Sequence, residues 1–311
     1  MSFAVKGKTA IATGAGSGIT LAFANLLLSR GCNVLFADLA LRPEAKQLVD
    51  RYSTRGTSSP RAVFRKCDVT KWDDLKGTFD EAMAEFGGVD VVCPGAGVYE
   101  PPFSNFWYPP GTKESIDTIS GGHYAMLDIN LIHPIRITQL ALQHFTSKKK
   151  PGSIVHISSI AGQRANLLTP LYNASKHGIN GFVRSLAPLE EAVGVRVTAV
   201  APGIIKTPLW TEHPDKLKTV GEDDLWVSPE AVAEVMLDLI EKDKVSAGTI
   251  EGGTILEVSK RIRKVEPFND PGPSGEGNTA SNIDLGHKDV LNILFSANRV
   301  GGGQPAVAVA A

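Results

Sequence analysis

A short apolar run leads straight into a glycine-rich turn in the stretch Thr9-Ala10-Ile11-Ala12-Thr13-Gly14-Ala15-Gly16-Ser17-Gly18-Ile19-Thr20. The run has the length and the consecutive apolar positions of a buried parallel strand. An amphipathic segment, Ser17 to Arg30, begins within the turn and is followed by a glycine. Gly14 and Gly18 let backbone N–H groups and the helix N-terminus approach a phosphate. The stretch therefore predicts an α/β fold with a dinucleotide-binding turn; the alternative is a tight strand-to-helix turn that binds nothing.

The alternation of short apolar runs and longer amphipathic stretches continues over most of the 311 residues. Consecutive apolar positions mark seven predicted strands: Thr9 to Thr13, Asn33 to Ala37, Ala62 to Lys66, Val89 to Cys93, Ser153 to Ser158, Arg196 to Ala201 and Thr254 to Val258. Amphipathic periodicity marks the predicted helices: Ser17 to Arg30, Pro43 to Tyr52, Trp72 to Phe86, Ala125 to Phe145, Leu171 to Val193 and Pro229 to Ile240. Right-handed crossovers between parallel strands then predict a doubly wound, seven-stranded parallel sheet in a three-layer α/β/α sandwich.

Two segments interrupt this pattern. Residues Tyr99 to Gly122 are rich in proline and aromatic residues, follow a strand end and are too long for a plain connector, so we expect a lid or a substrate wall. Pro267 to Asn282 is dense in Pro, Gly, Ser and Asn, and a short helix from Asp289 to Ala297 precedes an Ala/Val-rich end. We therefore predict a catalytic domain over residues 1–260 and a tail outside the sheet over 261–311.

Charge and cysteine content exclude several classes of protein. The 32 basic and 33 acidic residues give a net charge of −1, which argues against binding to nucleic acid or to an anionic membrane. No apolar segment reaches the roughly 20 residues that a membrane span needs. The odd set Cys32, Cys67 and Cys93 contains no CxxC pair and no histidines at metal-ligand spacing. These features predict a cytoplasmic protein without a metal site.

A carboxylate at the end of the second strand points to the kind of dinucleotide. Asp38 lies 20 residues after Gly18, where it can accept hydrogen bonds from ribose hydroxyls. A 2′-phosphate would meet Asp38 as a like charge, which favours NAD over NADP, although nearby Arg42 argues the other way. A helix-capping role for Asp38 is the alternative. Asp68 and Val69, just past the third strand, are expected beside the adenine ring.

A second pair of residues points to acid–base chemistry. Tyr172 and Lys176 are four residues apart on a predicted helix and therefore share a face. An ammonium about 4 Å from a phenolate is worth roughly 4 kcal/mol at an effective dielectric constant near 20, or about 3 pKa units. We therefore expect Lys176 to lower the pKa of Tyr172 toward the range of a working base. A chance Tyr-x-x-x-Lys pair is the alternative.

Taken in chain order, the glycine turn, Asp38, the segment Tyr172-Asn173-Ala174-Ser175-Lys176 and the segment Pro202-Gly203-Ile204-Ile205-Lys206-Thr207 resemble the short-chain dehydrogenase/reductase family, in its compact single-domain branch, over about Val5 to Lys260. Within the family they look closest to 15-hydroxyprostaglandin dehydrogenase-like members, many of them fungal. The resemblance implies a Rossmann-type fold and a homodimer or homotetramer. It also implies a hydride transfer between NAD, or less readily NADP, and a secondary alcohol or ketone.

The resemblance also implies roles for individual residues. The catalytic set it implies is Asn130, Ser159, Tyr172 and Lys176. The cofactor-binding set it implies is Gly14, Ser17, Gly18, Ile19, Asp38, Leu39, Asp68, Val69, Gly95, Tyr172, Lys176, Ile205 and Thr207. Ser158 competes with Ser159, because strand alternation points only one of the two into the cleft. For Asn130, whose counterpart in the family holds a water through its backbone carbonyl, the alternative is a local helix kink.

The chain departs from the family pattern at two places. Thr20 stands where the turn usually has its last glycine, and Pro94-Gly95 stands where the family usually has two asparagines. From these departures we expect looser cofactor binding with the chemistry intact. They also leave open a fold-retaining binding protein without catalysis.

Aromatic residues bear on the substrate. Leu209, Trp210 and Trp226, together with the cluster Phe103 to Tyr108, predict a bulky apolar or aromatic substrate, unless they only pack the lid. The main prediction is an NAD-dependent alcohol dehydrogenase with Tyr172 as general base. An NADPH-dependent ketone reductase of secondary metabolism is the first alternative.

Overall fold

The computed structural model describes residues 2–53, 60–212, 217, 220–267 and 283–296, and its centre is one mixed β-sheet. The sheet has the strand order β10-β9-β6-β5-β4-β1-β2-β3. Its strands are β1 (Thr9–Thr13), β2 (Asn33–Asp38), β3 (Ala62–Lys66), β4 (Val91–Pro94), β5 (Gly152–Ile157), β6 (Val195–Pro202), β9 (Ile255–Val258) and β10 (Ile262–Lys264). A separate hairpin is formed by β7 (Lys244–Val245) and β8 (Gly248–Thr249).

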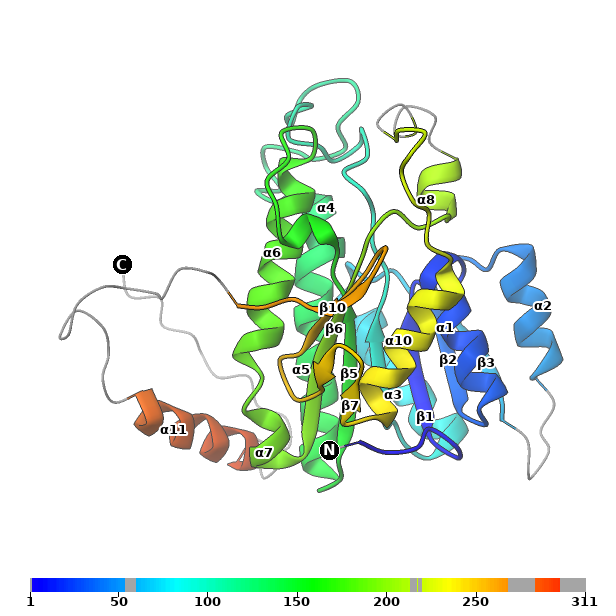
Figure 1. Cartoon of the computed structure of the whole chain (residues 1–311), viewed down its shortest axis with the longest axis vertical. Coiled ribbons are helices and arrows are strands. Elements are labelled where there is room, and N and C mark those ends of the chain that lie inside the picture. Colours follow the sequence, from blue (N-terminus) through cyan, green and yellow to red (C-terminus); the bar gives the residue numbers. More distant parts are fainter. Residues whose placement is uncertain (1, 54–59, 213–216, 218–219, 268–282, 297–311) are drawn as a thin grey trace.

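Helices cover both faces of the sheet (Figure 1). Their bounds are α1 (Gly18–Ser29), α2 (Pro43–Arg51), α3 (Trp72–Phe86), α4 (Ala125–Leu127), α5 (His133–Ser147), α6 (Pro170–Ser185), α7 (Leu189–Val193), α8 (Pro208–Thr211), α10 (Pro229–Glu241) and α11 (Ile283–Ser296). One buried apolar cluster joins α1 and α10 to one face, and another joins α3, α5 and α6 to the opposite face. The predicted three-layer α/β/α sandwich is confirmed.

All seven predicted strands are present, and they pair in parallel with one another. The predicted number is nevertheless one too low, because β10 adds an eighth strand that pairs antiparallel with β9. Ile262–Lys264 is short and mostly exposed, so it carries no run of buried positions that could reveal it in the sequence. Residues 262–264, assigned from the sequence to a tail outside the sheet, therefore belong to the sheet.

Two helices predicted as continuous differ from a regular α-helix, each time near a proline: one contains a π-helical turn and the other is divided in two. The stretch from Ala125 to Phe145 contains a π-helical turn, η1 (Asp128–Ile132), between α4 and α5. An α-helix would pair the carbonyl of Asn130 with the N–H of residue 134, which is proline and has none. Likewise Pro188 cannot donate to the carbonyl of Arg184, and the helix from Leu171 to Val193 divides into α6 and α7.

In the C-terminal region, α11 lies against α5 and begins six residues before the predicted Asp289. The Pro/Gly-rich stretch from 268 to 282 and the Ala/Val-rich end lie outside the described residues. None of the helices in the described ranges has both the length and the apolar character needed to cross a membrane.

The topology places the ends of the central strands together. β1 lies between β2 and β4. The chain adds β2 and β3 on one side of β1, and β4, β5 and β6 on the other, so the strand order reverses between β1 and β4. In open α/β sheets, ligands bind outside the carboxyl ends of the strands at such a switch point. The segment from 99 to 122 and helix α8 both extend beyond this end of the sheet (Figure 1).

Candidate active site

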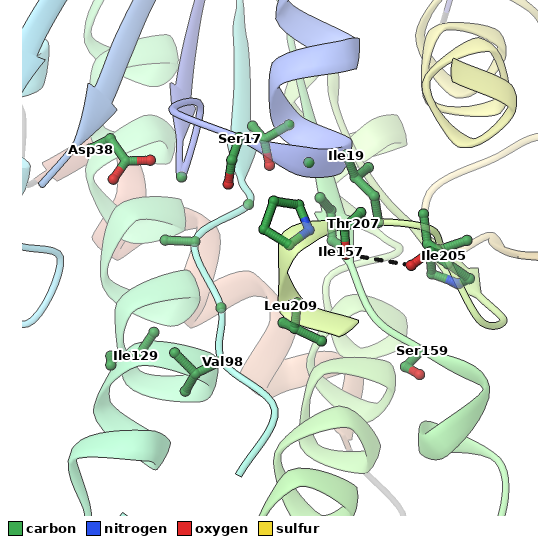
Figure 2. A pocket seen from close by; sticks show the side chains of 18 of the residues that line it. Ser17, Ile19, Asp38, Val98, Ile129, Ile157, Ser159, Ile205, Thr207 and Leu209 are labelled. Carbon is green, nitrogen blue, oxygen red and sulfur yellow. Dashed lines mark hydrogen bonds between the residues drawn. The ribbon is translucent and has the colours of Figure 1, made fainter. Parts of the chain in front are cut away.

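A cleft of about 350 Å³ opens at the carboxyl ends of the strands (Figure 2). Every residue of the predicted cofactor-binding set lines it, as do Ser158 and Ser159. Asn130 does not, although its neighbour Ile129 does. Leu209 and Trp210, which were expected on the substrate side, also line the cleft. The other lining residues lie outside the predicted cofactor-binding and catalytic sets: Thr20, Cys67, Ala96, Gly97, Val98, Ile129, Ile157, Pro202, Gly203 and Pro208.

The glycine turn has the backbone geometry that its sequence predicts. Gly14 and Gly18 have φ angles of +71° and +61°, in the left-handed region that favours glycine. A Cβ atom on Gly14 would lie 2.6 Å from the Cα of Ala96, so this residue must be glycine on steric grounds as well. Helix α1 begins at Gly18, and in the part of the chain that the structure describes its N-cap residue Ser17 makes no capping bond through its side chain. The first N–H groups of α1 thus face the cleft, an arrangement that fits a dinucleotide pyrophosphate.

Asp38 lines the cleft and also holds the glycine turn. Its Oδ2 accepts a hydrogen bond from the Gly16 N–H at 2.8 Å. The N-cap residue of α2 is Arg42, so the predicted alternative, a helix-capping role for Asp38, does not hold for that helix. Figure 2 shows Asp38 at the end of the cleft near Ser17, far from Ser159. Leu39, Asp68 and Val69 line the cleft together with Asp38.

Arg42, the residue that argued for NADP, is paired. Its two terminal nitrogens donate to the two carboxylate oxygens of Glu212, both at 2.6 Å. Glu212 directly follows α8, so this bidentate pair joins the loop after β2 to the segment that covers the other end of the cleft. Any 2′-phosphate that approached Arg42 would therefore have to compete with the carboxylate of Glu212 for its guanidinium.

The two departures from the family pattern meet in space. A Cβ atom on Gly95 would lie only 2.2 Å from Oγ1 of Thr20, and 2.8 Å from the carbonyl oxygen of Thr13. Thr20 is 2% exposed and occupies the volume into which a side chain at position 95 would project. Thr20 and Gly95 are therefore complementary rather than two independent losses.

The residues expected to carry the chemistry converge at the other end of the cleft. Lys176 Nζ donates to the carbonyl of Ile157 at 2.8 Å and lies 5.4 Å from the centre of the Tyr172 ring. The hydroxyls of Ser159 and Tyr172 are hydrogen-bonded to each other. Ser159 lies just past β5, whereas Tyr172 and Lys176 share one face of α6, as their spacing predicts.

The two serines, which both line the cleft, have different partners. The hydroxyl of Ser158 donates to Oδ1 of Asn180 at 2.6 Å, within the packing of β5 against α6. Ser159 faces the phenol of Tyr172 instead. The geometry therefore favours Ser159 as the serine that would contact a substrate.

The pKa of Tyr172 differs from the expectation drawn from its spacing to Lys176. Burial raises the pKa of Tyr172 to about 12, the hydrogen bond from Ser159 opposes this rise, and the charge of Tyr99 adds to it. Burial also lowers the pKa of Lys176 to about 8. The expected lowering of the Tyr172 pKa by Lys176 is thus wrong: Lys176 is not among the causes of the shift, and the loss of hydration raises the pKa instead.

Asn130 lies in the π-helical turn and contacts the cleft indirectly. Its side chain pairs twice with the backbone of Val98, accepting from the N–H at 2.8 Å and donating to the carbonyl at 2.7 Å. A π-helical turn, which is a common cause of helix kinks, occurs where a local kink was the alternative for Asn130, and it coincides with these contacts. π-Helical turns often occur at functional sites, so the kink and a role in the site are compatible.

A buried histidine connects this turn to the glycine turn. His133 Nδ1 lies 3.0 Å from the carbonyl of Ile129, which can only accept, so this nitrogen carries the proton. Nε2 then accepts from the hydroxyl of Thr13 at 3.0 Å, and that hydroxyl oxygen accepts from the Gly95 N–H at 3.0 Å. The chain of bonds holds the loop after β4 in place even though the side-chain amides usual in the family are missing there.

Buried neutral histidines predict sensitivity to acid. Burial lowers the pKa of His133 to about 4 and that of His156 to about 3. The unfolded chain binds these protons near pH 6.5, so their contribution is fully present above pH 6.5 and is lost as the pH falls toward 4. We expect the free energy of unfolding to drop by up to about 1.4 kcal/mol per pH unit for each histidine over this range. Urea unfolding at several pH values tests this: the slope should be smaller in His156→Gln, and an equal slope in both proteins would contradict the prediction.

The substrate end of the cleft is aromatic, but not through all of the predicted residues. Leu209 and Trp210 line it, and the ring of Trp226 packs against Trp210 with centroids 6.1 Å apart. Within the predicted cluster Phe103 to Tyr108, however, residues 106–108 are exposed and do not line the cleft. Instead, the ring of Tyr99 lies against both Tyr172 and Trp210, with centroids 4.7 and 5.1 Å away. Tyr99 was missed because its importance depends on how the following segment folds back.

The potential metal ligands of the described residues are not clustered. Among the residues that the structure describes, no three His, Cys, Asp or Glu side chains are placed to hold a metal ion. All three cysteines are buried and unpaired.

Comparison with known proteins gives consistent matches. A family model described as short chain dehydrogenase matches residues 8–218. L-fucose dehydrogenase from Bos taurus is 29% identical over 279 residues, covering 85% of this chain and 96% of that protein. The 15-hydroxyprostaglandin dehydrogenase (NAD(+)) from Rattus norvegicus is 31% identical over 266 residues, which cover 79% of this chain and 91% of that protein.

Solved structures give the same fold. A short-chain type dehydrogenase/reductase from Mycobacterium marinum superimposes with a TM-score of 0.67 at 22% identity, covering 82% of this chain and 95% of that one. A 3-ketoacyl-(acyl-carrier-protein) reductase from Brucella melitensis, complexed with NADH, gives a TM-score of 0.64 at 21% identity, covering 82% and 98%. At these identities the likeness concerns the fold alone.

Proposed function

Because the chain belongs to the short-chain dehydrogenase family, we propose that it is an NAD-dependent oxidoreductase that acts on the CH–OH group of a secondary alcohol or, in reverse, on a ketone. The family resemblance predicted from the motifs is confirmed. One observation carries the proposal: Ser159, Tyr172 and Lys176 converge at one end of a cleft whose other end holds the glycine turn and Asp38.

Each residue has a role that follows from its position. NAD, when bound, supplies the hydride acceptor. The paired hydroxyls of Ser159 and Tyr172 are placed to contact a substrate oxygen together, with Ser159 donating a hydrogen bond and Tyr172 removing the alcohol proton. The ammonium of Lys176 favours the tyrosinate that forms. Ile205 and Thr207 line the same cleft and would hold the carboxamide end of the cofactor.

Two features support NAD over NADP. Asp38 lies in the cleft as a negative charge, and Arg42 is engaged by Glu212. A relative that is 31% identical is named for NAD(+). Steady-state rates with a panel of secondary alcohols and ketones, measured with both cofactors, test the proposal. A higher kcat/KM with NAD supports it, whereas a strong preference for NADPH would favour the alternative of a ketone reductase.

The pH dependence of alcohol oxidation follows from the pKa of Tyr172. The base must be deprotonated, and burial raises its pKa to about 12, so kcat/KM for oxidation should rise with pH from 7 upward. The rise should be less steep above about pH 8, where Lys176 loses the charge that favours the tyrosinate. Ketone reduction uses the protonated phenol and should not rise over this range. Initial rates in both directions from pH 6 to 10 check this, and a flat profile for oxidation would contradict the role of Tyr172.

The walls of the cleft support a bulky apolar or aromatic substrate. Tyr99 and Trp210 stack next to the phenol of Tyr172, and Leu209 adds an apolar surface. We expect the kcat/KM values of cyclic and aromatic secondary alcohols to exceed that of 2-propanol. No turnover with any member of the panel under either cofactor would instead favour a non-catalytic binding protein.

We also propose the domain bounds, the cellular location and the assembly of the protein. We place the catalytic domain at residues 1–260 together with β10, which completes its sheet, and the tail after β10. Three buried, unpaired cysteines fit the reducing cytoplasm. The family resemblance supports a homodimer or homotetramer built on α5 and α6, where Ile132 is exposed next to α5. Light scattering of the purified protein measures the assembly.

A further inference from the structure

Glu100 is a buried carboxylate at the start of the segment from 99 to 122. Only 4% of the residue is exposed, and its φ angle of +35° is unusual for a residue with a side chain. Strained backbone of this kind persists where the surrounding contacts fix it, and such positions cluster at functional sites. The contacts of Glu100 are therefore informative.

The carboxylate of Glu100 binds the backbone of Tyr172. Its Oε2 accepts from the Tyr172 N–H at 2.9 Å, and its Oε1 accepts from the Phe106 N–H at 3.2 Å. The carbonyl of Glu100 accepts from Nδ2 of Asn105 at 3.0 Å. One side chain thus ties the fold of its own loop to helix α6.

The bond to Tyr172 satisfies a helix terminus. Tyr172 is the third residue of α6, and the first four N–H groups of a helix have no partner inside it. The N-cap residue, Thr169, supplies no side-chain acceptor within the described part of the chain. Glu100 replaces that cap from a distance of 72 residues along the sequence, and its negative charge suits the positive end of the helix dipole.

The residue before Glu100 contacts the same tyrosine from another side. The ring of Tyr99 meets the Tyr172 ring edge-on, with an interplanar angle of 83°. Adjacent residues therefore hold both the backbone and the ring of Tyr172. A shift of the Tyr172 backbone would move its hydroxyl away from Ser159. It would thereby weaken the hydrogen bond that opposes the rise in the pKa of Tyr172.

We propose that Glu100 is a positioning residue for Tyr172: as an N-terminal cap of α6 supplied by the substrate-side loop, it fixes the phenol in bonding distance of Ser159. The proposal rests on the function given above for Tyr172. Both carboxylate oxygens act as acceptors, whereas glutamine has one acceptor oxygen and one donor NH2 group and carries no charge. In either orientation of the amide, one N–H group faces a donor, so the link between the loop and α6 is weakened. The shape of the side chain remains the same in Glu100→Gln, which isolates the bond from the packing.

The test compares Glu100→Gln and Glu100→Ala with a matched control, Glu241→Gln. Glu241 also accepts a backbone N–H, that of Val5 at 2.8 Å, and it does not line the cleft. We expect Glu100→Gln to lower kcat by about 10- to 100-fold, because displacement of a catalytic group by about 1 Å has effects of this order. The dissociation constant for NAD should change less than about twofold, since the glycine turn is untouched.

The pH profile gives a readout that a purely structural role would not change. Loss of the Ser159 contact raises the pKa of Tyr172 further, so the rising limb of oxidation should move to higher pH in Glu100→Gln and stay in place in Glu241→Gln. Amide exchange in the unmodified protein adds a test that needs no variant. The Tyr172 N–H should be strongly protected, and rapid exchange would overturn the proposal.

The outcomes separate this proposal from the proposed function. If Tyr172→Phe abolishes turnover while Glu100→Gln matches Glu241→Gln in kcat and pH profile, the role of Glu100 is wrong and the function stands. If Tyr172→Phe keeps full activity, both fail. If Glu100→Ala does not fold, Glu100→Gln and amide exchange still decide the question.

Discussion

Tyr172→Phe is expected to lower kcat for alcohol oxidation by about 1000-fold, since a positioned general base contributes roughly 10²- to 10⁴-fold. The substitution removes only the hydroxyl that is hydrogen-bonded to Ser159, while the ring keeps its contacts with Tyr99 and with Lys176. The dissociation constant for NAD and the melting temperature should therefore change little. Steady-state kinetics, fluorescence titration with NADH and thermal unfolding measure the three quantities.

A matched control comes from the substrate-side loop. Tyr108 is 41% exposed and does not line the cleft, so Tyr108→Phe should keep the rate of the unmodified protein. A fall of less than about tenfold in Tyr172→Phe would mean that another group takes the proton. Equal losses in both variants would indicate a general effect of the substitution rather than base catalysis.

Gly95→Asn, which restores a residue usual in the family, is expected to damage the protein rather than improve it. Its Cβ atom would overlap Oγ1 of Thr20 and press on the carbonyl of Thr13. Overpacking of a rigid site costs typically 1–3 kcal/mol, and we expect about 3 kcal/mol here because one of the two neighbours is backbone. Since Gly95 lines the cofactor cleft, the affinity for NAD should fall at the same time.

A substitution at Thr20 distinguishes the overlap with the Thr20 side chain from the overlap with the Thr13 backbone. Thr20→Gly removes the side-chain overlap but leaves that with Thr13, so the double variant Thr20→Gly/Gly95→Asn should recover part of the lost stability, with a coupling energy of at least about 1 kcal/mol. Gly181→Asn is the control, because a Cβ atom there would meet no described atom within 4 Å. Additive effects of Thr20→Gly and Gly95→Asn in urea unfolding would show that the two positions are independent.

The features that the sequence predicts correctly are mostly those that depend on residues close together in the chain. The glycine turn, Asp38 and the pair Tyr172 and Lys176 occupy the positions expected, because each depends on a few consecutive residues at the start or end of one element. The seven parallel strands were recognisable since burial on both faces makes them continuously apolar. The eighth strand, β10, lacks that signal because it is a short, exposed edge.

The remaining features depend on contacts between distant residues. Gly95 faces Thr20 across 75 positions, and Glu100 meets Tyr172 across 72, so neither contact leaves a periodic pattern in the sequence. The pKa of Tyr172 was misjudged for the same reason: its spacing to Lys176 is local, whereas its burial results from Tyr99 and the rest of the folded cleft.

The position of Glu100 has a consequence for protein engineering. Exchanging loops between relatives is a common route to a new substrate range, and the segment from 99 to 122 is the obvious candidate for such an exchange. A graft that replaces the whole segment also removes the carboxylate bound to Tyr172. A graft that begins after Phe106 keeps both backbone partners of Glu100, so it changes the outer part of the loop while the catalytic helix keeps its cap.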